Sequence, residues 1–294
     1  MDPGASPVEG KRADPSPAET MARLLAENTE LRRAAAENAQ LRRAVAECQR
    51  RIAAERQLSE QLRQVVLPLP AAPFMVPGLL VAVRYQPAEH GEPVGGDWYH
   101  ATGLADGTAI LAVGDVAGHG LAAAAVMAEL RHALAALAVT TTTDPAELLG
   151  HLNRILCDHD GERPRTATAA VGRFDRATGV LTWAQAGHPA PLLVRGGEVS
   201  ELARPPGMLL GANVRSTYQT ATVPLAAGDI LLLYTDGLIE SRGGSHDQGL
   251  DDVADSLLAS VAEGDGCSLT DLLRRLGPTN PADDMCVLAA RPCL

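Results

Sequence analysis

The segment Ile230-Leu231-Leu232-Leu233-Tyr234-Thr235-Asp236-Gly237 joins an apolar run to an acidic turn. An apolar run of this length predicts a strand that is buried on both faces. The same pattern recurs where Ala109–Val113 leads into Gly114-Asp115. A carboxylate at the end of a buried strand is held rigidly, and a small neighbour leaves space for water and a phosphate. Aspartates of this kind, brought together from distant segments, suit hard divalent cations, which prefer oxygen ligands.

The same reading of apolar runs extends over the rest of the chain. It predicts strands at Leu79–Tyr85, Thr108–Val113, Ala167–Phe174, Val180–Gln185, Pro191–Val194, Thr217–Val223, Asp229–Tyr234 and Cys286–Ala290. It predicts helices at Leu121–Val139, Pro145–Cys157, Leu250–Glu263 and Leu269–Leu276. Strands outnumber helices and do not alternate regularly with them. This favours a sandwich of sheets with helices packed outside over a doubly wound fold.

The N-terminal part of the chain has a different composition. Residues 1–20 are rich in Pro, Ala, Ser and Asp, which predicts a disordered tail. Residues 21–67 have no Gly or Pro and carry a ten-residue repeat, which predicts a helix that forms a short parallel coiled coil and a homodimer. A single solvated helix is the alternative. Residues 68–77 form a Pro-rich linker, and residues 78–294 form the globular domain.

Charge and composition exclude several classes of function. The first 66 residues hold 11 basic and 10 acidic residues, and the remaining 14 basic and 26 acidic residues give the rest a charge of −12. The strong negative charge of this part of the chain argues against nucleic-acid binding, because it would repel the phosphate backbone. Lys11 is the only lysine, which excludes a Walker-type loop and a Schiff-base mechanism in the globular part. No secretory signal or membrane span is expected, so we expect a cytoplasmic protein.

Cysteines and glycine motifs offer two further interpretations, both weak. The five cysteines form no Cys-x-x-Cys pair, so neither a disulfide framework nor a zinc site is expected. Cys157 and Arg163 have the spacing of cysteine phosphatases, but the acidic residues between them would repel phosphate. The segment from Gly118 to Ala123 loosely matches a dinucleotide-binding loop and leaves a nucleotide-binding oxidoreductase as one alternative. Asp115 stands where the pyrophosphate would pass, which argues against it.

Several longer motifs occur in an order that resembles one known family. They are Gly95-Gly96-Asp97-Trp98-Tyr99, Gly114-Asp115-Val116 with Gly118-His119-Gly120, Thr166-Ala167-Thr168, Ala186-Gly187-His188-Pro189, Leu232 to Glu240, and Asp283-Asp284. Together they resemble the metal-dependent PPM-type Ser/Thr protein phosphatases, and most closely their bacterial SpoIIE-like branch. The resemblance runs from Pro77 to Arg291.

The resemblance implies a fold and a metal site. The fold would be an α/β/β/α sandwich of two antiparallel sheets flanked by helices. Two Mn²⁺ or Mg²⁺ ions would bind at one edge. Asp115 would bridge the two ions, with Asp97 and the main-chain carbonyl of Val116 on one ion and Asp236 and Asp283 on the other. Asp284 is the second choice at the Asp283 position. Two such ions about 3.5–4 Å apart activate a bridging water, so no protein nucleophile is needed.

The resemblance also implies a substrate: phosphoserine or phosphothreonine on a STAS-domain anti-anti-sigma protein. Members of the branch are often switched by a helix that precedes the catalytic domain. Two residues depart from the family pattern, since His100 replaces an Asp and Cys286 stands where Thr or Ala is commoner. His100 puts an accessory acidic contact in doubt and supports one alternative, a weak pseudophosphatase that binds phosphoproteins. His119 is predicted either as a general acid or as a turn residue, and His188 as a turn residue.

Overall fold

The computed structural model describes residues 16–88, 95–158, 165–240, 245–262, 268–277, 280 and 283–293. The chain divides into two compact units, Met1–Gln57 and Leu58–Leu294. The second unit therefore starts well before the predicted boundary at residue 78. Its buried core includes Leu67, which is fully inaccessible to solvent, and this explains why the unit extends back into the predicted helix and linker.

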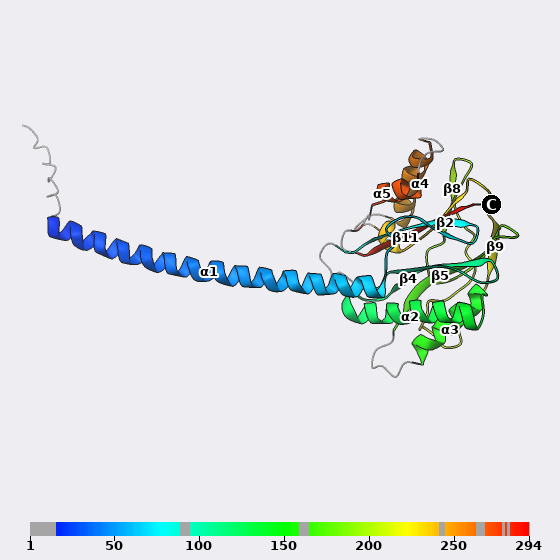
Figure 1. The fold of residues 1–294 in the computed structure, drawn as a ribbon, viewed down its shortest axis with the longest axis horizontal. Coiled ribbons are helices and arrows are strands. Elements are labelled where there is room, and N and C mark those ends of the chain that lie inside the picture. Colours follow the sequence, from blue (N-terminus) through cyan, green and yellow to red (C-terminus); the bar gives the residue numbers. More distant parts are fainter. Residues whose placement is uncertain are drawn as a thin grey trace, which may run out of the picture. The chain divides into compact units, whose positions relative to one another are not determined.

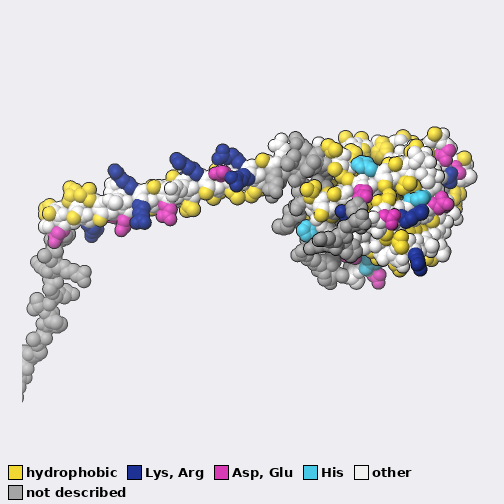
Figure 2. All heavy atoms as spheres, turned by 90° about the horizontal axis from the view of Figure 1, so that it is seen from below, with side chains coloured by type: hydrophobic (Ala, Val, Ile, Leu, Met, Phe, Trp, Pro, Cys, Tyr) yellow, Lys and Arg dark blue, Asp and Glu magenta, His cyan; other side chains and the backbone are white. Residues whose placement is uncertain are grey.

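Helix α1 spans Pro17–Val66; its residues up to Gln57 belong to the first unit and the rest belong to the second. It begins at Pro17 rather than at Met21, because Ser16 and Glu19 form a capping box. The Glu19 amide donates to Ser16 Oγ at 3.3 Å, and the Ser16 amide donates to Glu19 Oε2 at 2.8 Å. The rest of the predicted disordered tail, residues 1–15, lies outside the described residues. Figure 2 shows apolar, basic and acidic side chains interspersed along α1.

The second unit is built on two sheets in which all neighbouring strands are antiparallel. The first sheet has the order β1 (Phe74–Val76), β2 (Leu79–Gln86), β11 (Met285–Pro292), β10 (Ile230–Tyr234), β7 (Leu192–Arg195) and β8 (Glu198–Glu201). The second has the order β3 (Trp98–Gly103), β4 (Thr108–Val116), β5 (Ala167–Asp175), β6 (Val180–Ala186) and β9 (Ala221–Pro224). The predicted pair of antiparallel sheets is confirmed.

Helices cover the outer face of each sheet (Figure 1). Helices α2 (Gly120–Thr140) and α3 (Pro145–Cys157) pack on the second sheet, and α4 (His246–Ala262) and α5 (Leu269–Arg275) pack on the first. Helix α2 is the only one in the described residues that is long and apolar enough to cross a membrane. Its buried residues, among them Met127, Leu130 and Leu134, belong to the core of this unit, which accounts for its composition.

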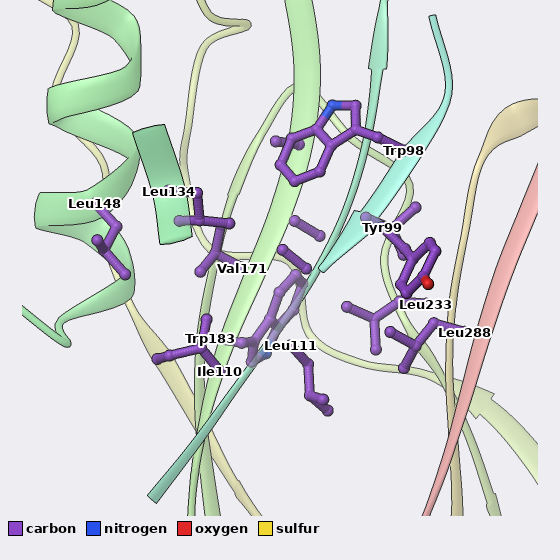
Figure 3. Close-up of a cluster of buried hydrophobic side chains, with 14 of the residues drawn as sticks. Trp98, Tyr99, Ile110, Leu111, Leu134, Leu148, Val171, Trp183, Leu233 and Leu288 are labelled. Carbon is purple, nitrogen blue, oxygen red and sulfur yellow. The ribbon is translucent and has the colours of Figure 1, made fainter. Parts of the chain in front are cut away.

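The main core lies between the two sheets and continues under α2 and α3. In Figure 3, Leu134 and Leu148 reach this core from the helices, while Leu233 and Leu288 reach it from the first sheet. A second apolar cluster fills the space between the first sheet and helices α4 and α5. Strand β4 is buried along nearly its whole length, as its apolar run predicts. The strands that end at the acidic turns are thus held in the interior of the second unit.

Four strands depart from the prediction. Strand β1 lies inside the predicted linker and forms a hairpin with β2, in which Val76 pairs with Leu79. Strands β3 and β8 were not predicted as strands. Strand β9 starts at Ala221 rather than at Thr217, because the Gln219 amide donates instead to the carbonyl of Pro206 at 3.2 Å.

Candidate metal centre

Asp115 is the next-to-last residue of β4 and lies at the edge where both sheets end. Residues 108–114 are buried, and Asp115 pairs in register with Thr168 of β5. Because the strand is packed on both faces and paired on both edges, the carboxylate has a fixed origin. Burial and repulsion from Asp236 raise the pKa of Asp115 to about 7.

Asp97 immediately precedes β3, and its side chain is almost fully buried. Its Oδ2 accepts a hydrogen bond from Thr235 Oγ1 at 2.7 Å. Burial, followed by the charge of Asp115, raises the pKa of Asp97 well above its usual range. In the protein without cations, burial and the neighbouring carboxylates therefore disfavour ionisation of both Asp97 and Asp115.

Two glycines allow the backbone to approach these carboxylates closely. A Cβ on Gly96 would lie 2.2 Å from the carbonyl oxygen of Val116 and 2.8 Å from Asp115 Oδ1. A Cβ on Gly95 would lie 1.3 Å from Asp284 Oδ2. Side chains at these positions would occupy the space in which the oxygens gather. The Gly-Gly-Asp motif thus leaves this space to the oxygens of Asp115, Val116 and Asp284.

Asp236 approaches the same edge from the other sheet. It starts the short 3-10 turn Asp236–Leu238 directly after β10 and Thr235. Burial, and then the charges of Asp283 and Glu240, raise the pKa of Asp236. The structure therefore brings Asp236 together with Asp97 and Asp115, whose pKa values respond to its charge.

The Asp283-Asp284 pair precedes β11 at this edge, and its two members face different neighbours. Asp283 is exposed, and its charge acts on Asp115 and Asp236. Asp284 is partly buried, accepts a hydrogen bond from the Ala88 amide at 3.0 Å, and acts on Asp97. Burial raises the pKa of Asp284. The site thus has a fifth carboxylate, whose part the sequence had left as a second choice.

The donor set suits hard divalent cations, since every group in it is an oxygen donor. Within the described residues, no three His, Cys, Asp or Glu side chains are already arranged to hold a metal ion. Asp97 and Asp284 are instead engaged with protein donors, Thr235 Oγ1 and the Ala88 amide. Among the described residues, no Arg or His is among the groups that lower the pKa of Asp97, Asp115 or Asp236. Divalent cations would supply the positive charge that this cluster lacks.

Several other predicted residues lie elsewhere. His119 is the exposed N-cap residue of α2, and its side chain makes no capping hydrogen bond. His100 is buried on β3, and burial together with the charge of Arg131 lowers its pKa to about 4. Cys157 ends α3, where its Sγ lies 3.8 Å from Asn153 Oδ1, and Arg163 lies outside the described residues.

The hydroxyl group of Thr235 is a part of the site that the sequence motifs did not predict. Its Oγ1 donates to Asp97 and accepts from the Cys286 amide at 2.8 Å, so one fully buried side chain joins β10, β11 and the start of β3. Its place beside Asp236 in the motif was visible, but its contacts depend on how the two sheets pack. Cys286 is also fully buried, and burial raises the pKa of its thiol.

Comparisons with known proteins show the family and the fold of this chain. The family model for stage II sporulation protein E (SpoIIE) matches residues 105–292, which include Asp115, Asp236 and Asp283 but not Asp97. The phosphoserine phosphatase RsbU of Bacillus subtilis is 28% identical over 149 residues, which are 50% of this chain and 43% of RsbU. This chain therefore matches less than half the length of that relative.

Two solved structures share the fold. The RsbU and RsbW domains of Rv1364c from Mycobacterium tuberculosis are 34% identical, with a TM-score of 0.62 over 75% of this chain and 61% of that one. The SiaA-PP2C domain of Pseudomonas aeruginosa is 26% identical, with a TM-score of 0.64 over 83% of this chain and 98% of that one. Nearly the whole SiaA domain therefore has a counterpart here.

Proposed function

Because the chain belongs to the SpoIIE family of PPM-type phosphatases, we propose that it is a metal-dependent protein serine/threonine phosphatase. Its substrate would be phosphoserine or phosphothreonine on a regulatory protein. The observation that carries the proposal is the meeting of Asp97, Asp115, Asp236 and Asp283 at one edge of the sandwich. Such a cluster of carboxylates can bind the cations that in turn bind a dianionic phosphate.

The proposed ligands follow the two sides of the cluster. Asp115, Asp97 and the Val116 carbonyl would hold one ion, and Asp236 and Asp283 the other, with Asp115 shared. Two Mn²⁺ or Mg²⁺ ions would make a bound water acidic and offset the charge of the phosphate. Asp97 and Asp115 would be ionised when the cations bind, because a hard cation needs the ionised carboxylate. Thr235 would keep Asp97 oriented throughout.

A small STAS-domain anti-anti-sigma protein is the proposed phosphorylated partner, in a bacterial cytoplasm. The name of RsbU as a phosphoserine phosphatase supports the residue type, and the pairing of RsbU and RsbW domains in Rv1364c supports a regulatory setting. The acidic body, with its charge of −12 beyond residue 66, supports a protein rather than a nucleic-acid partner.

The segment that enters the phosphatase unit is the proposed route for regulation. Arg131 of α2 donates to the carbonyl of Val66 at 3.3 Å and to the carbonyl of Tyr99 at 3.1 Å. Tyr99 in turn donates its hydroxyl to the carbonyl of Pro68. Tyr99 lies two residues after Asp97, so the end of α1 is connected to the metal centre by a short path. A conformational change at Val66–Pro68 would therefore alter the position of Asp97.

Helix α1 is the proposed means of dimerisation. Apolar side chains along it are exposed in the single chain: Leu24, Leu31, Leu41, Val45 and Ile52. A parallel coiled coil would cover them, with Asn28 and Asn38 disfavouring other registers. Light scattering should therefore give a dimer for the full chain and a monomer for a chain that begins near Pro70. Full-length protein that stays monomeric at micromolar concentration would contradict this.

The test of the proposed function is release of phosphate from phosphorylated STAS proteins, with and without Mn²⁺. We expect release only with Mn²⁺, and at least about a hundredfold slower release from the Asp236→Asn variant. Binding of a phosphorylated partner without release at any Mn²⁺ concentration would instead identify a pseudophosphatase. Equal release by wild type and Asp236→Asn would overturn the proposed site.

A further inference from the structure

His188 lies in the connection from β6 to β7, where the chain passes from one sheet to the other. It is a buried residue whose two ring nitrogens both have partners. Nδ1 lies 2.8 Å from Thr168 Oγ1 on β5, and Nε2 lies 3.0 Å from the carbonyl oxygen of Tyr234 on β10. Since β5 and β10 belong to different sheets, one imidazole ring joins the two layers of the sandwich.

The partners determine which nitrogen of His188 holds the proton. A carbonyl oxygen can only accept, so Nε2 must donate to Tyr234. Burial lowers the pKa of His188 to about 4, so the ring is neutral and Nδ1 is an acceptor. The hydroxyl of Thr168 therefore donates to Nδ1. The link runs in one direction, from Thr168 through His188 to the backbone of Tyr234.

Each end of this link lies next to a carboxylate of the metal centre. Thr168 is the cross-strand partner of Asp115. Tyr234 lies two residues before Asp236, with Thr235 between them. The charge of Asp236 is the largest charge effect on the pKa of Asp115, so the two carboxylates repel each other when ionised. A cross-link next to both of them would set the distance between them.

The connection that bears His188 is itself held firmly. The His188 amide donates to Gln185 Oε1 at 3.0 Å, and Gln185 Nε2 donates to the carbonyl of Pro205 at 2.7 Å. Gly187 has a φ of +67°, which favours glycine, and its amide donates to the carbonyl of Gly207 at 3.2 Å. The ring of His188 is thus presented from a backbone that has little freedom to move.

We propose that His188 is a positioning residue, which sets the separation of Asp115 and Asp236 through Thr168 and the Tyr234 carbonyl. This inference rests on the proposed function, since it assumes that these carboxylates hold cations. It goes beyond the predicted turn role, because a turn residue would need neither ring nitrogen. His188 touches neither the ions nor the substrate in this account.

The test uses four variants of the full chain. Thr168→Val removes the donor and keeps the shape. His188→Gln keeps a donor that can reach the Tyr234 carbonyl but loses the link to Thr168. His188→Ala removes both contacts, and a Thr168→Val/His188→Ala double variant completes a double-mutant cycle. The main readout is the dissociation constant of Mn²⁺ without substrate, measured from the electron paramagnetic resonance signal of free Mn²⁺. The melting temperature without metal is the second readout.

We expect Thr168→Val and His188→Gln to weaken Mn²⁺ binding by roughly tenfold, as loss of an outer-shell partner commonly does. The double variant should bind no more weakly than His188→Ala, because both changes break one link. Asp229→Asn, at the far end of β10, is the matched control: it should lower the melting temperature and leave Mn²⁺ binding unchanged. If His188→Ala does not fold, Thr168→Val alone decides the question.

The outcomes separate this inference from the proposed function. Folded variants that melt at lower temperature but bind Mn²⁺ like wild type would show a purely structural His188 and overturn the inference alone. Wild-type protein that binds no Mn²⁺ would overturn the metal centre and the inference with it. Weaker binding in Thr168→Val and His188→Gln, with Asp229→Asn unchanged, would support both.

Discussion

Strand β10 has a buried aspartate before it and a partly buried aspartate after it, and their surroundings are opposite. At the first end, Asp229 receives hydrogen bonds from Arg195 at 3.0 and 2.5 Å and from the Ala226 amide at 2.7 Å. Burial alone would raise the pKa of Asp229, but these partners outweigh it and lower the pKa. At the other end, burial and neighbouring carboxylates raise the pKa of Asp236.

The difference is the one expected if the Asp229 end serves stability and the Asp236 end holds the proposed metal centre. Asp229 has a counter-charge, so its burial is compatible with ionisation. Asp236 follows β10, which is about 17 Å long, and lies among other carboxylates. Repulsion among these carboxylates destabilises the folded protein. A cluster that lowers the free energy of unfolding in the cation-free protein is expected at a site where ligand binding offsets this loss.

Asp236→Asn should have the largest effect on activity. The amide keeps the size of the side chain but loses the charge that a hard cation requires. Metal activation supplies several kcal/mol, so Mn²⁺-dependent phosphate release should fall by at least about a hundredfold. The melting temperature without metal should equal or exceed that of wild type, because repulsion is relieved.

Two matched variants sharpen this result. Asp229→Asn should lower the melting temperature and leave the rate of phosphate release unchanged. Cys157→Ser should leave both unchanged, since its thiol lies on α3 outside the site. An active Asp236→Asn protein together with an inactive Cys157→Ser protein would refute the two-metal mechanism.

Thr235→Val should have the next largest effect. Valine keeps the shape of the side chain but removes the donor to Asp97 and the acceptor of the Cys286 amide. An unsatisfied buried amide costs about 1–3 kcal/mol, and a disoriented ligand should reduce activity roughly tenfold. Calorimetry and Mn²⁺ titration of phosphate release would measure these two losses.

Thr108→Val provides the control at the opposite end of β4 from Asp115. Thr108 is buried, and its hydroxyl donates to Asp106 Oδ1 at 2.6 Å. Its loss should affect stability alone. If Thr108→Val and Thr235→Val changed the Mn²⁺ dependence of phosphate release equally, the role of Thr235 in orienting Asp97 would be disproved.

The pH dependence of stability should differ between the two ends, which is the smallest of these effects. Asp115 has a folded pKa of about 7 against an ordinary value of 3.8, so the folded protein holds a proton that the unfolded chain releases. Its contribution to stability is therefore lost as pH rises from about 4 to about 7. Asp229 has a lowered pKa, so its contribution is lost as pH falls below about 4.

Melting of the metal-free protein across pH 3–8 would check both signs. Asp115→Asn should flatten the decline between pH 4 and 7, and Asp229→Asn should flatten the decline in acid. Mn²⁺ at a hundred times its dissociation constant should add about 2.7 kcal/mol above pH 7, or roughly 5–10 °C. If the melting temperature of Asp115→Asn varied with pH as that of wild type does, Asp115 would not be the cause of the decline between pH 4 and 7.

The contrast also explains what could be predicted from the sequence. Buried runs such as Thr108–Val113 and Asp229–Tyr234 identified the start of β4, which continues to Val116, and β10 to within one residue, because burial on both faces leaves an apolar sequence. Strand β8, Glu198–Glu201, is a largely exposed edge strand and has no such pattern. Strand β3 contains His100 and ends at Gly103, and it becomes a strand through pairing with β4.

The candidate site divides in the same way. The motifs predicted which aspartates would meet: Asp97, Asp115 and Asp236 each stand beside a glycine near the end of a strand, and Asp283 precedes a short strand. They did not show that Asp284 is the more buried of its pair, or that Thr235 and His188 connect the two sheets. These contacts depend on how strands far apart in sequence pack together, which periodicity does not encode.

The most direct test of the central claim counts the cations that the wild-type chain binds. Equilibrium dialysis of the full chain against Mn²⁺ at pH 8, followed by metal analysis, gives the number of ions per chain. The carboxylate cluster predicts two ions for wild type and for Asp229→Asn, and fewer than two for Asp236→Asn. A wild-type chain that binds no Mn²⁺, or an Asp236→Asn chain that binds as many ions as wild type, would contradict the account.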